Sequence, residues 1–380
     1  MRLLFITHNT HRAGAPLVLV QFLTWLKQHE STIDTVVLDL QEGVLKDDFQ
    51  AVCNDYINLT GLKPKTNSYI SKGLQRLSTK PKKQTKMELV RQLNLKAFDV
   101  IYANTIKAIP YGVLLKAQHG HTKLIAHVHE LPTVIQLLLP DFKAYVNDID
   151  RFIAVSNLVQ HSLHAHWQIP QKKISRVYPY SVIKQEPIQV NSTESFHIGA
   201  SGLVDWRKGY DVFIQVARYV KKQNPKLPIQ FTWVGGISDV NRIIIEADLL
   251  KLGLADVVSF VGELSHPFEH YNRFDVFLMC SREDPFPLVC IEVAMLKKPI
   301  ICFEKATGTA EVIEQGGGEI VPYLDVEAMG DAVLDYAGHP EKRLADGARA
   351  QALFSEFTPH VICPQLFQVI QAVRHGQIDH

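Results

Sequence analysis

The chain has 380 residues, of which 46% are hydrophobic and 21% are charged, and its formal net charge at pH 7 is +1. This length favours two domains over one, and the composition is that of an ordinary globular protein. A charge so near zero gives no global argument for binding to nucleic acid or to a membrane, so such binding would need a local patch. No apolar stretch approaches the roughly 18 residues of a membrane span, and the apolar run at residues 3–6 is too short for a signal peptide.

The five cysteines are scattered and show no CxxC spacing. Three of them stand in apolar runs, where a reduced thiol behaves as a small hydrophobic group. Because reduced thiols are typical of the cytosol, we expect a cytoplasmic protein that associates at most peripherally with the inner face of a membrane.

Short β-branched runs alternate with helical patterns along the chain, which is typical of parallel sheets covered by helices. Strands are expected at 3–7, 35–40, 100–103, 124–129, 152–156, 196–201, 229–234, 257–261, 276–279 and 299–303. A polar, proline-containing segment at 186–195 is predicted to be a linker. The sequence therefore predicts two doubly wound α/β domains, 1–185 and 196–356, followed by a C-terminal helical segment at 357–380.

The segment Lys63–Lys96 holds ten lysines and arginines but one acidic residue, Glu88. One interpretation is an exposed loop followed by a helix. The other is a patch on the acceptor side or against a membrane surface, where the cations would meet phosphates or anionic lipid.

Two adjacent cations, Arg207 and Lys208, follow the strand expected at 196–201 and precede Gly209. In open parallel sheets, ligands bind beyond the carboxyl ends of the strands. Fixed cations at that place suit a diphosphate leaving group, on which negative charge grows as the bond breaks. Taken alone, these three residues are more simply an exposed turn.

An acidic, proline-rich loop follows the strand expected at 276–279 and opens a helix near Pro287. Glu292 falls in the early turns of this helix, and Asp284 lies eight residues earlier on the loop. A carboxylate at Glu292 could hold the hydroxyl groups of a ribose, while free amides at the helix N-terminus could hold phosphate. From the loop, Asp284 could reach the hydroxyl groups of a sugar.

This acidic pair resembles the E-x7-E signature of glycosyltransferase family 4, also described as the group 1 glycosyl transferases. The resemblance spans nearly the whole chain and is strongest over residues 199–322. Further matches occur in the expected order at Ala13-Gly14-Ala15-Pro16, Ala103-Asn104-Thr105, His127-Val128-His129-Glu130, Arg207-Lys208-Gly209, Trp233-Val234-Gly235-Gly236, Phe260-Val261-Gly262 and Thr307-Gly308-Thr309-Ala310-Glu311.

The resemblance implies a GT-B fold, in which two Rossmann-like domains face a cleft and the C-terminal helix crosses back to the first domain. It implies a retaining, metal-independent enzyme without a cofactor. Such an enzyme moves a sugar from a nucleoside-diphosphate sugar to a hydroxyl group of a glycan, glycolipid or other acceptor, in the synthesis of cell-surface polysaccharide or glycoconjugates. No nucleic-acid partner is implied.

The same resemblance assigns roles to residues. Lys208 and Arg207 would neutralise the diphosphate, Asp284 would contact the donor sugar, and His129 would lie near the transferring sugar. Donor or nucleotide binding would involve Glu292 at the ribose, Gly14 at a close backbone approach, the backbone of Phe286, Pro287 and Leu288, and Glu283 as a partial substitute for Asp284.

Three departures from the family pattern concern the donor. Asp284 is one methylene shorter than the usual glutamate, and Leu203 stands where the family commonly has an arginine. The segment Tyr178-Pro179-Tyr180-Ser181 stands where the family often has Pro-Asn-Gly. The sequence leaves the sugar, the nucleotide, the acceptor and the oligomeric state open.

Other functions remain to be compared with transfer. A GT-B nucleotide-sugar epimerase would share the fold but would act without an acceptor, and a non-catalytic sugar-nucleotide-binding protein would turn over no donor. His127 and His129 would face the same way on a strand, as metal ligands do, but no acidic or cysteine residue at a suitable spacing completes a metal site. Neither half shows the Gly-x-Gly-x-x-Gly motif of a nicotinamide dehydrogenase.

Overall fold

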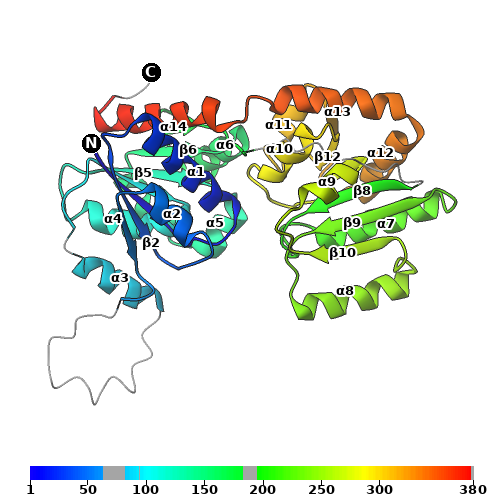
Figure 1. Ribbon diagram of the computed structural model, residues 1–380, viewed down its shortest axis with the longest axis horizontal. Helices are drawn as coiled ribbons and strands as arrows, with labels where there is room; N and C mark the ends of the chain where they lie inside the picture. The colour runs from blue at the N-terminus through cyan, green and yellow to red at the C-terminus, as the bar shows by residue number, and fades with distance from the viewer. Residues whose placement is uncertain (63–81, 94, 183–194, 378–380) are drawn as a thin grey trace, which may run out of the picture. The chain divides into compact units, whose positions relative to one another are not determined.

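The computed structural model describes residues 1–62, 82–93, 95–182 and 195–377 (Figure 1). They form two units. The first consists of Met1–Val155, Val159–Val177 and Pro359–His380, and the second of Ser156–Leu158 and Tyr178–Thr358.

The first unit contains a parallel sheet of seven described strands, in the order β3-β2-β1-β4-β5-β6-β7. The order reverses direction between β1 and β4, and ligands bind beyond the carboxyl ends of strands at such a reversal. The strands are β1 (Arg2–Thr7), β2 (Asp34–Asp39), β3 (Asp55–Asn58), β4 (Val100–Asn104), β5 (Lys123–Val128), β6 (Arg151–Ala154) and β7 (Ile174–Arg176). The helices are α1 (Gly14–His29), α2 (Lys46–Val52), α3 (Lys82–Gln92), η1 (Ile106–Ala108), α4 (Ile109–Lys116), α5 (Pro132–Leu138), η2 (Phe142–Asp148), α6 (Asn157–Trp167), η3 (Gln171–Lys173) and α14 (Pro359–Arg374).

The second unit repeats this plan with six described strands in the order β10-β9-β8-β11-β12-β13. The order reverses between β8 and β11. The strands are β8 (Phe196–Ser201), β9 (Ile229–Val234), β10 (Val258–Gly262), β11 (Val276–Met279), β12 (Ile300–Phe303) and β13 (Gly318–Val321). The helices are α7 (Tyr210–Gln223), α8 (Asp239–Leu252), α9 (Phe268–Arg273), α10 (Leu288–Met295), α11 (Ala310–Ile313), α12 (Val326–Gly338) and α13 (Pro340–Phe354).

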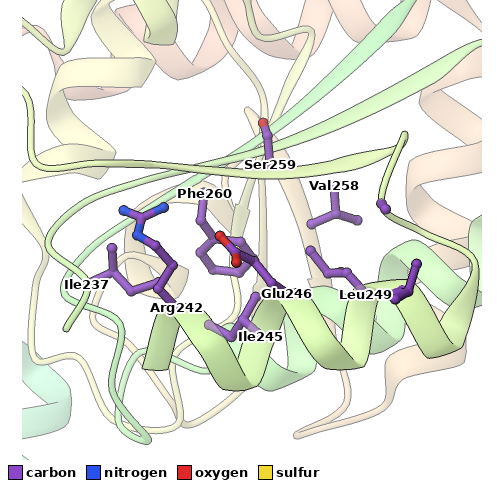
Figure 2. Close-up of a pocket in the computed structure, with 10 residues that line it drawn as sticks. Ile237, Arg242, Ile245, Glu246, Leu249, Val258, Ser259 and Phe260 are labelled. Atoms are coloured by element: carbon purple, nitrogen blue, oxygen red, sulfur yellow. The ribbon is translucent and has the colours of Figure 1, made fainter. Parts of the chain in front are cut away.

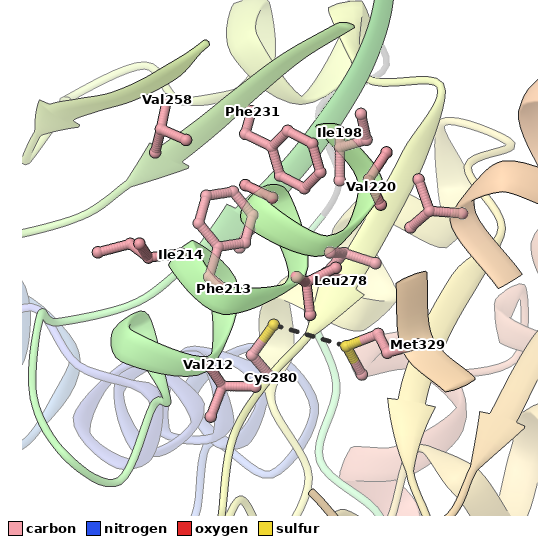
Figure 3. Close-up of a cluster of buried hydrophobic side chains, with 14 of the residues drawn as sticks. Ile198, Val212, Phe213, Ile214, Val220, Phe231, Val258, Leu278, Cys280 and Met329 are labelled. Carbon is pink, nitrogen blue, oxygen red and sulfur yellow. Dashed lines mark hydrogen bonds between the residues drawn. The ribbon is translucent and has the colours of Figure 1, made fainter. Parts of the chain in front are cut away.

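The core of the second unit lies between its sheet and helices α7 and α12 (Figure 3). Phe213 of α7 packs edge-on against Phe231 of β9, with ring centroids 5.3 Å apart. The sulfur atoms of Cys280 and Met329 lie 3.8 Å apart on the α12 side. The apolar residues of α7 recur every three or four positions, so one side of the helix is buried. This packing fixes the first turn of α7, which directly follows Lys208 and Gly209.

The C-terminal helix belongs to the first unit, which confirms the predicted crossover. Helix α14 contacts α1, β4 and β5. Its Leu366, Ile370 and Val373 are buried, and the ring of Phe367 lies 6.0 Å from that of Trp25 on α1.

The boundary between the units differs from the predicted end of the first domain at residue 185. Tyr178 already packs with the second unit, with its ring 5.1 Å from that of Phe286 and 5.3 Å from that of Phe357. The amide of Ser181 donates to the carbonyl of Phe357 at 3.2 Å. The predicted C-terminal segment likewise begins at Pro359 rather than at residue 357.

Two sequence predictions fall largely outside the described residues. The predicted linker at 186–195 does so except for Ser195, and in the basic segment 63–96 only α3 and its C-terminal continuation are described. In the part of the chain that is described, no helix combines the length and the apolar character needed to span a bilayer.

Candidate functional site

The two loops that the sequence singles out lie at neighbouring strand ends of the second unit. Strands β8 and β11 are paired in parallel at the point where the strand order reverses. The loop after β8 carries Arg207 and Lys208, and the loop after β11 carries Asp284. The amide of Arg282 donates to the carbonyl of Arg207 at 2.8 Å, which joins the two loops.

Gly209 allows the two loops to approach this closely. It precedes the first residue of α7 with φ 74° and ψ 36°, in the left-handed region that favours glycine. A Cβ atom at this position would lie 2.0 Å from the carbonyl oxygen of Cys280. Any side chain here would therefore push the cation-bearing loop away from the acidic loop.

Lys208 is fixed along its whole length. Its amide donates to Oδ1 of Asp205 at 2.9 Å, and its Nζ forms an ion pair with Oδ2 of Asp284. Its aliphatic carbons lie against Gly202, where a Cβ atom would come within 3.0 Å of Cδ of Lys208. The ammonium group is thus held at the ends of strands β8 and β11.

Arg207 supplies a second cation to the same carboxylate. Its Nη1 lies 3.5 Å from Oδ1 of Asp284 and donates to the carbonyl of Glu283 at 3.1 Å. The arginine side chain is more exposed than that of Lys208. It therefore has room to meet a ligand while it keeps its contact with the acidic loop.

Asp284 is buried, with 6% of its side chain exposed. Its amide donates to the carbonyl of Ala306 at 2.8 Å, and Ser281 Oγ donates to its Oδ2 at 3.3 Å. Burial by itself would raise the pKa of Asp284, but the charges of Lys208 and Arg207 hold that pKa below its ordinary value. The carboxylate is therefore charged at neutral pH, and both of its oxygens face the protein's own cations.

Glu292 projects from α10, which begins after Pro287, as the sequence predicts. Its Oε1 accepts a hydrogen bond of 3.1 Å from Ser181 Oγ. Burial, together with the charge of Glu292, raises the pKa of Tyr271, whose hydroxyl group is 2.8 Å from Ser201 Oγ. Glu292 thus lies among hydroxyl groups near the end of β8.

The other predicted residues of the acidic loop make contacts within the protein, so most of their side chains are not available to a ligand. The ring of Phe286 packs among those of Tyr178, Phe354 and Phe357, so only its backbone is available to a ligand. The carbonyl of Glu283 is already used by Arg207. Pro287 and Leu288 form the start of α10.

The loop Thr307–Thr309 supports the acidic loop from the next strand end. Thr307 bridges to Asp284, and the amide of Gly308 donates to the carbonyl of Pro285 at 3.1 Å. A Cβ atom at Gly308 would lie 2.4 Å from that carbonyl oxygen. Glu311, just beyond, accepts from the amides of Asn157 and Leu158 at 2.9 and 2.7 Å and from the hydroxyl of Tyr178 at 3.0 Å.

Three polar residues of this site were missed from the sequence. Ser281 holds Asp284, Ser181 holds Glu292, and Tyr271 meets Ser201. Ser281 stands three residues before Asp284, which is a local signal. Ser181 and Tyr271 are 111 and 70 residues from their partners, so no local pattern points to them.

His129 and Gly14 belong to the first unit, whereas the other predicted site residues belong to the second. Gly14 is the exposed first residue of α1. His129 follows β5, and its ring centroid lies 4.0 Å from that of His127. The Nε2 atoms of both rings and Oδ1 of Asn104 are buried without a hydrogen-bond partner in the described chain. These atoms form a second polar cluster, at the strand ends of the first sheet.

Burial keeps the histidines of this second cluster neutral. It lowers the pKa of His129 to about 3, with a further contribution from His8, and it lowers the pKa of His8 to about 4, with contributions from Lys107 and His11. The pKa of His127 is also lowered by burial and by His129. Tyr102 lies 2.6 Å from Nδ1 of His127. Among the described residues, no group of three or more histidine, cysteine or acidic side chains is arranged to hold a metal ion.

These lowered pKa values predict a loss of stability in acid. The folded-state pKa values lie below the unfolded value of about 6.5, so the unfolded chain binds more protons as the pH falls from about 6.5 toward 4. Each such histidine removes about 1.4 kcal/mol of folding free energy per pH unit in that window. Urea unfolding at pH 7.5, 6.5 and 5.5 measures this slope.

The variant His129→Gln is expected to flatten the slope by about one histidine's share, whereas His161→Gln, at an exposed position of α6, is expected to leave it unchanged. Equal slopes in the wild type and in His129→Gln would show that His129 is not held neutral by the fold.

Two protein families match this chain. Residues 195–339 match the family described as "Glycosyl transferases group 1", and residues 69–180 match "Glycosyltransferase Family 4". The first match contains the loops with Lys208 and Asp284, and the second contains His127 and His129.

Curated proteins that resemble this chain include named glycosyltransferases. The lipopolysaccharide core biosynthesis mannosyltransferase LpcC of Rhizobium leguminosarum bv. viciae is 28% identical over 163 residues, which are 40% of this chain and 44% of that protein. The alpha-galactosylglucosyldiacylglycerol synthase of Streptococcus pneumoniae is 26% identical over 274 residues, 64% of this chain and 69% of that protein. The chain spans 44% of the length of LpcC, and 12% and 30% of the lengths of two further curated relatives, an exopolysaccharide phosphotransferase and a D-inositol 3-phosphate glycosyltransferase.

HepE of Anabaena, solved in complex with UDP and glucose, superimposes with a TM-score of 0.77 at 19% identity, covering 98% of this chain and 100% of that one. At this identity the likeness shows the fold alone. Two parallel sheets with helices, arranged as in such neighbours, make this a GT-B fold.

Proposed function

We propose, because the chain belongs to the group 1 and family 4 glycosyltransferases, that it is an enzyme that transfers a sugar from a nucleoside-diphosphate sugar to a hydroxyl group. The observation that carries this proposal is the cluster of Lys208, Arg207 and Asp284 at the reversal of strand order in the second unit. Two cations that share one carboxylate keep a net positive charge, which suits a diphosphate.

In this proposal, Lys208 and Arg207 bind the diphosphate and stabilise the charge that grows on it as the glycosidic bond breaks. Fixed cations supply this stabilisation, which supports transfer without a metal ion. Glu292 accepts hydrogen bonds from ribose hydroxyl groups. The presence of UDP and glucose in the HepE complex supports a ligand of this class.

We further propose that transfer retains the anomeric configuration. The acceptor oxygen bonds to the anomeric carbon on the face from which the diphosphate leaves, and the acceptor's proton passes to a phosphate oxygen. This route needs no protein nucleophile. Asp284 is the carboxylate paired with both cations, and its buried ion pairs make it a poor nucleophile.

The names of the relatives favour an acceptor in polysaccharide, lipopolysaccharide or glycolipid synthesis. The neutral polar cluster around His129 offers unpartnered hydrogen-bonding atoms to a hydroxyl-bearing group. We also propose that the protein is located in the cytoplasm and contacts a membrane peripherally through the basic segment 63–96.

The proposed activity is tested by incubating the protein with UDP- and GDP-sugars, with and without glycan and glycolipid acceptors. We expect a glycosylated product that forms only with acceptor present. Conversion of the nucleotide sugar into its epimer without acceptor would assign the protein to the epimerases. Tight binding of a nucleoside diphosphate with no turnover of any sugar would make it a binding protein.

The role of Asp284 is tested by Asp284→Asn. Because Asp284 faces the two cations, removing its charge should make the cluster more attractive to phosphate. We expect nucleoside-diphosphate affinity to rise by roughly three- to tenfold, about 1 kcal/mol, since the removed charge lies a few ångströms from the ligand. Calorimetric titration with UDP and GDP measures this change.

The role that the family resemblance gives to Asp284 predicts a different result for the same variant. If its carboxylate contacts the donor sugar, Asp284→Asn would leave affinity for the nucleoside diphosphate unchanged and would weaken only binding of the complete nucleotide sugar. Asp205→Asn is a suitable control because Asp205 Oδ1 accepts from the backbone of Lys208 rather than from its ammonium group.

A further inference from the structure

The second polar cluster, at the strand ends of the first sheet, contains a pair of side chains on neighbouring strands. Asn104, the last residue of β4, is the register partner of His127 on β5, and the side chains of paired residues lie on the same face of a sheet. The two residues are 1% and 2% exposed. Oδ1 of Asn104 and Nε2 of His127 have no hydrogen-bond partner in the described chain. Buried polar atoms are rarely left in this state, so each of them needs an explanation.

The orientation of the Asn104 amide is fixed by its other end. Nδ2 of Asn104 donates to the carbonyl of Ala15 at 3.1 Å, close to the first residue of α1. The amide nitrogen therefore faces the helix, and the atom left without a partner is the oxygen. Asn104 thus contributes a buried acceptor.

Tyr102 determines which nitrogen of His127 carries the proton. The hydroxyl oxygen of Tyr102 lies 2.6 Å from Nδ1 of His127 and has no further hydrogen-bond partner in the described part of the chain. If Nδ1 donated to this oxygen, the phenolic proton would be buried without an acceptor, which is costly. Tyr102 therefore donates to Nδ1. Because burial keeps the ring of His127 neutral, its single proton is on Nε2, and His127 contributes a buried donor.

A buried donor and a buried acceptor that do not bond to each other are together complementary to a hydroxyl group. The hydroxyl oxygen can accept from Nε2 of His127 while the hydroxyl proton goes to Oδ1 of Asn104. An ionised carboxylate or phosphate has no proton to give to Asn104, and an ammonium group has no lone pair to accept from His127. The pair therefore selects a neutral hydroxyl group.

The backbone beside the pair is strained. Thr105 follows Asn104 with φ 90° and ψ 158°, a conformation that a β-branched residue rarely adopts. Its amide donates to the carbonyl of His127 at 3.0 Å, and its Oγ1 lies 3.0 Å from Nδ1 of His8. Strain of this kind is found mainly at ligand and active sites, where the surrounding structure imposes it. Here it fixes the end of β4 against the end of β5.

The pair lies at the carboxyl ends of its strands, where parallel sheets bind their ligands. His8 and His129, at the same strand ends, are only partly buried. Nε2 of His129 is another buried atom without a partner in the described residues, and its ring centroid lies 4.0 Å from that of His127. A ligand that arrives at the strand ends therefore meets His129 first and the pair beneath it.

A cavity of about 380 Å³ between α8 and the edge strand β10 offers a different kind of surface (Figure 2). Ile245, Leu249 and Phe260 give it apolar walls. Ser259, which also lines it, already donates from Oγ to Oγ1 of Thr232 at 3.3 Å. None of the buried polar atoms that lack a partner among the described residues lines this cavity. Recognition of a hydroxyl group is therefore assigned to the strand ends of the first sheet.

We propose that Asn104 and His127 bind one hydroxyl group of a sugar substrate, and that Tyr102 is a positioning residue that holds His127 in the Nε2–H form. This inference rests on the proposed transfer of a sugar. A donor sugar and a glycan acceptor both carry hydroxyl groups, and the experiments below distinguish the two sources.

The form of His127 is tested without any substrate. Nitrogen-15 spectra of the histidine rings of the full chain, with the His127 signals assigned by their loss in His127→Phe, should show a proton on Nε2 at pH 7.5. Tyr102→Phe should give His127 a mixture of the two neutral forms. Tyr111→Phe, at a buried tyrosine of α4, should leave the His127 signals unchanged. A proton on Nδ1 in the wild type would overturn the inference.

The bound hydroxyl group is tested by double-mutant cycles. UDP-glucose, UDP-galactose, GDP-mannose and their monodeoxy sugars are titrated into the wild type and into the double variant Tyr102→Phe with His127→Phe, which leaves no unpaired hydroxyl group behind. If the hydroxyl group belongs to the donor, one monodeoxy sugar should bind the wild type roughly five- to tenfold more weakly than its parent does. The double variant should bind both equally, and the affinity for UDP and GDP should not change.

If the hydroxyl group belongs to the acceptor, the same coupling should appear only in kcat/KM for monodeoxy acceptors. In either case Asn104→Leu should lose discrimination against the same deoxy sugar, because one hydroxyl group meets both residues. Ser259→Ala, in the cavity beside β10, should keep the wild-type discrimination.

Failure of the proposed function and failure of this inference give different results. A protein that turns over no sugar would remove the proposed function, and this inference with it. A working transferase in which neither Asn104→Leu nor the double variant changes the discrimination against any monodeoxy donor or acceptor would overturn this inference alone. The pair would then be the site of an ordered water molecule.

Discussion

Replacement of Lys208 by alanine is expected to lower kcat/KM for glycosyl transfer by at least about a hundredfold. Removing one preorganised group that stabilises developing charge typically costs about 3 to 4 kcal/mol of transition-state binding. The loss here includes a second effect, because Asp284 would keep its buried charge with only Arg207 beside it, at 3.5 Å. Initial rates with the donor and acceptor identified by the screen above measure the change.

Two variants separate the charge of Lys208 from its position. Lys208→Arg keeps a cation next to Asp284, so it should unfold near the wild-type temperature, yet a bulkier guanidinium at this packed position should still slow transfer. Lys305→Ala removes an exposed lysine of the same unit and should leave the rate unchanged. Wild-type turnover in Lys208→Ala would remove this residue from the proposed diphosphate site.

Replacement of Glu292 by alanine is expected to reduce nucleotide affinity and kcat/KM by one to two orders of magnitude, about 1.4 to 2.7 kcal/mol. The reason is the loss of charge-assisted hydrogen bonds to the ribose hydroxyl groups. Titration of wild type and variant with a nucleoside diphosphate and with its 2′,3′-dideoxy analogue forms a double-mutant cycle.

In that cycle the variant should lose affinity for the natural nucleotide but bind the dideoxy analogue as well as the wild type does. Equal losses for both ligands would contradict ribose binding by Glu292. Ser181→Ala removes the hydrogen bond that Ser181 donates to Oε1 of Glu292. It should weaken natural-nucleotide binding by a smaller factor, because the carboxylate itself remains.

In the first sheet, the sequence predicted the central strands better than the edge strands. Strands such as β1 and β4 are buried on both faces, so they appear as continuous apolar runs. Strands β3 and β7 close the two edges of the first sheet and were not predicted. Each has only three or four residues, and polar side chains interrupt both, so their position depends on pairing with a neighbour rather than on local pattern.

The candidate site residues could be proposed from the sequence, but their contacts with one another could not. Lys208 and Asp284 are separated by 76 residues, and the family resemblance predicts that Asp284 contacts the donor sugar, which stays a prediction. The sequence did not predict that this aspartate is buried beside two cations. The hydrogen bond from its amide to the carbonyl of Ala306 helps to hold it there, and this contact depends on packing that no local pattern records.

The C-terminal helix has a consequence for how the protein is made. Residues 178–358 form nearly all of the second unit in one continuous stretch, so that unit can fold once its own residues have left the ribosome. The first 155 residues emerge earlier, yet their unit lacks α14, which packs on α1, β4 and β5. The half of the protein that is synthesised first therefore matures last. Until residues 359–374 arrive, the apolar residues that α14 covers stay exposed on the nascent chain, and exposed apolar surface of this kind makes a folding intermediate prone to aggregate.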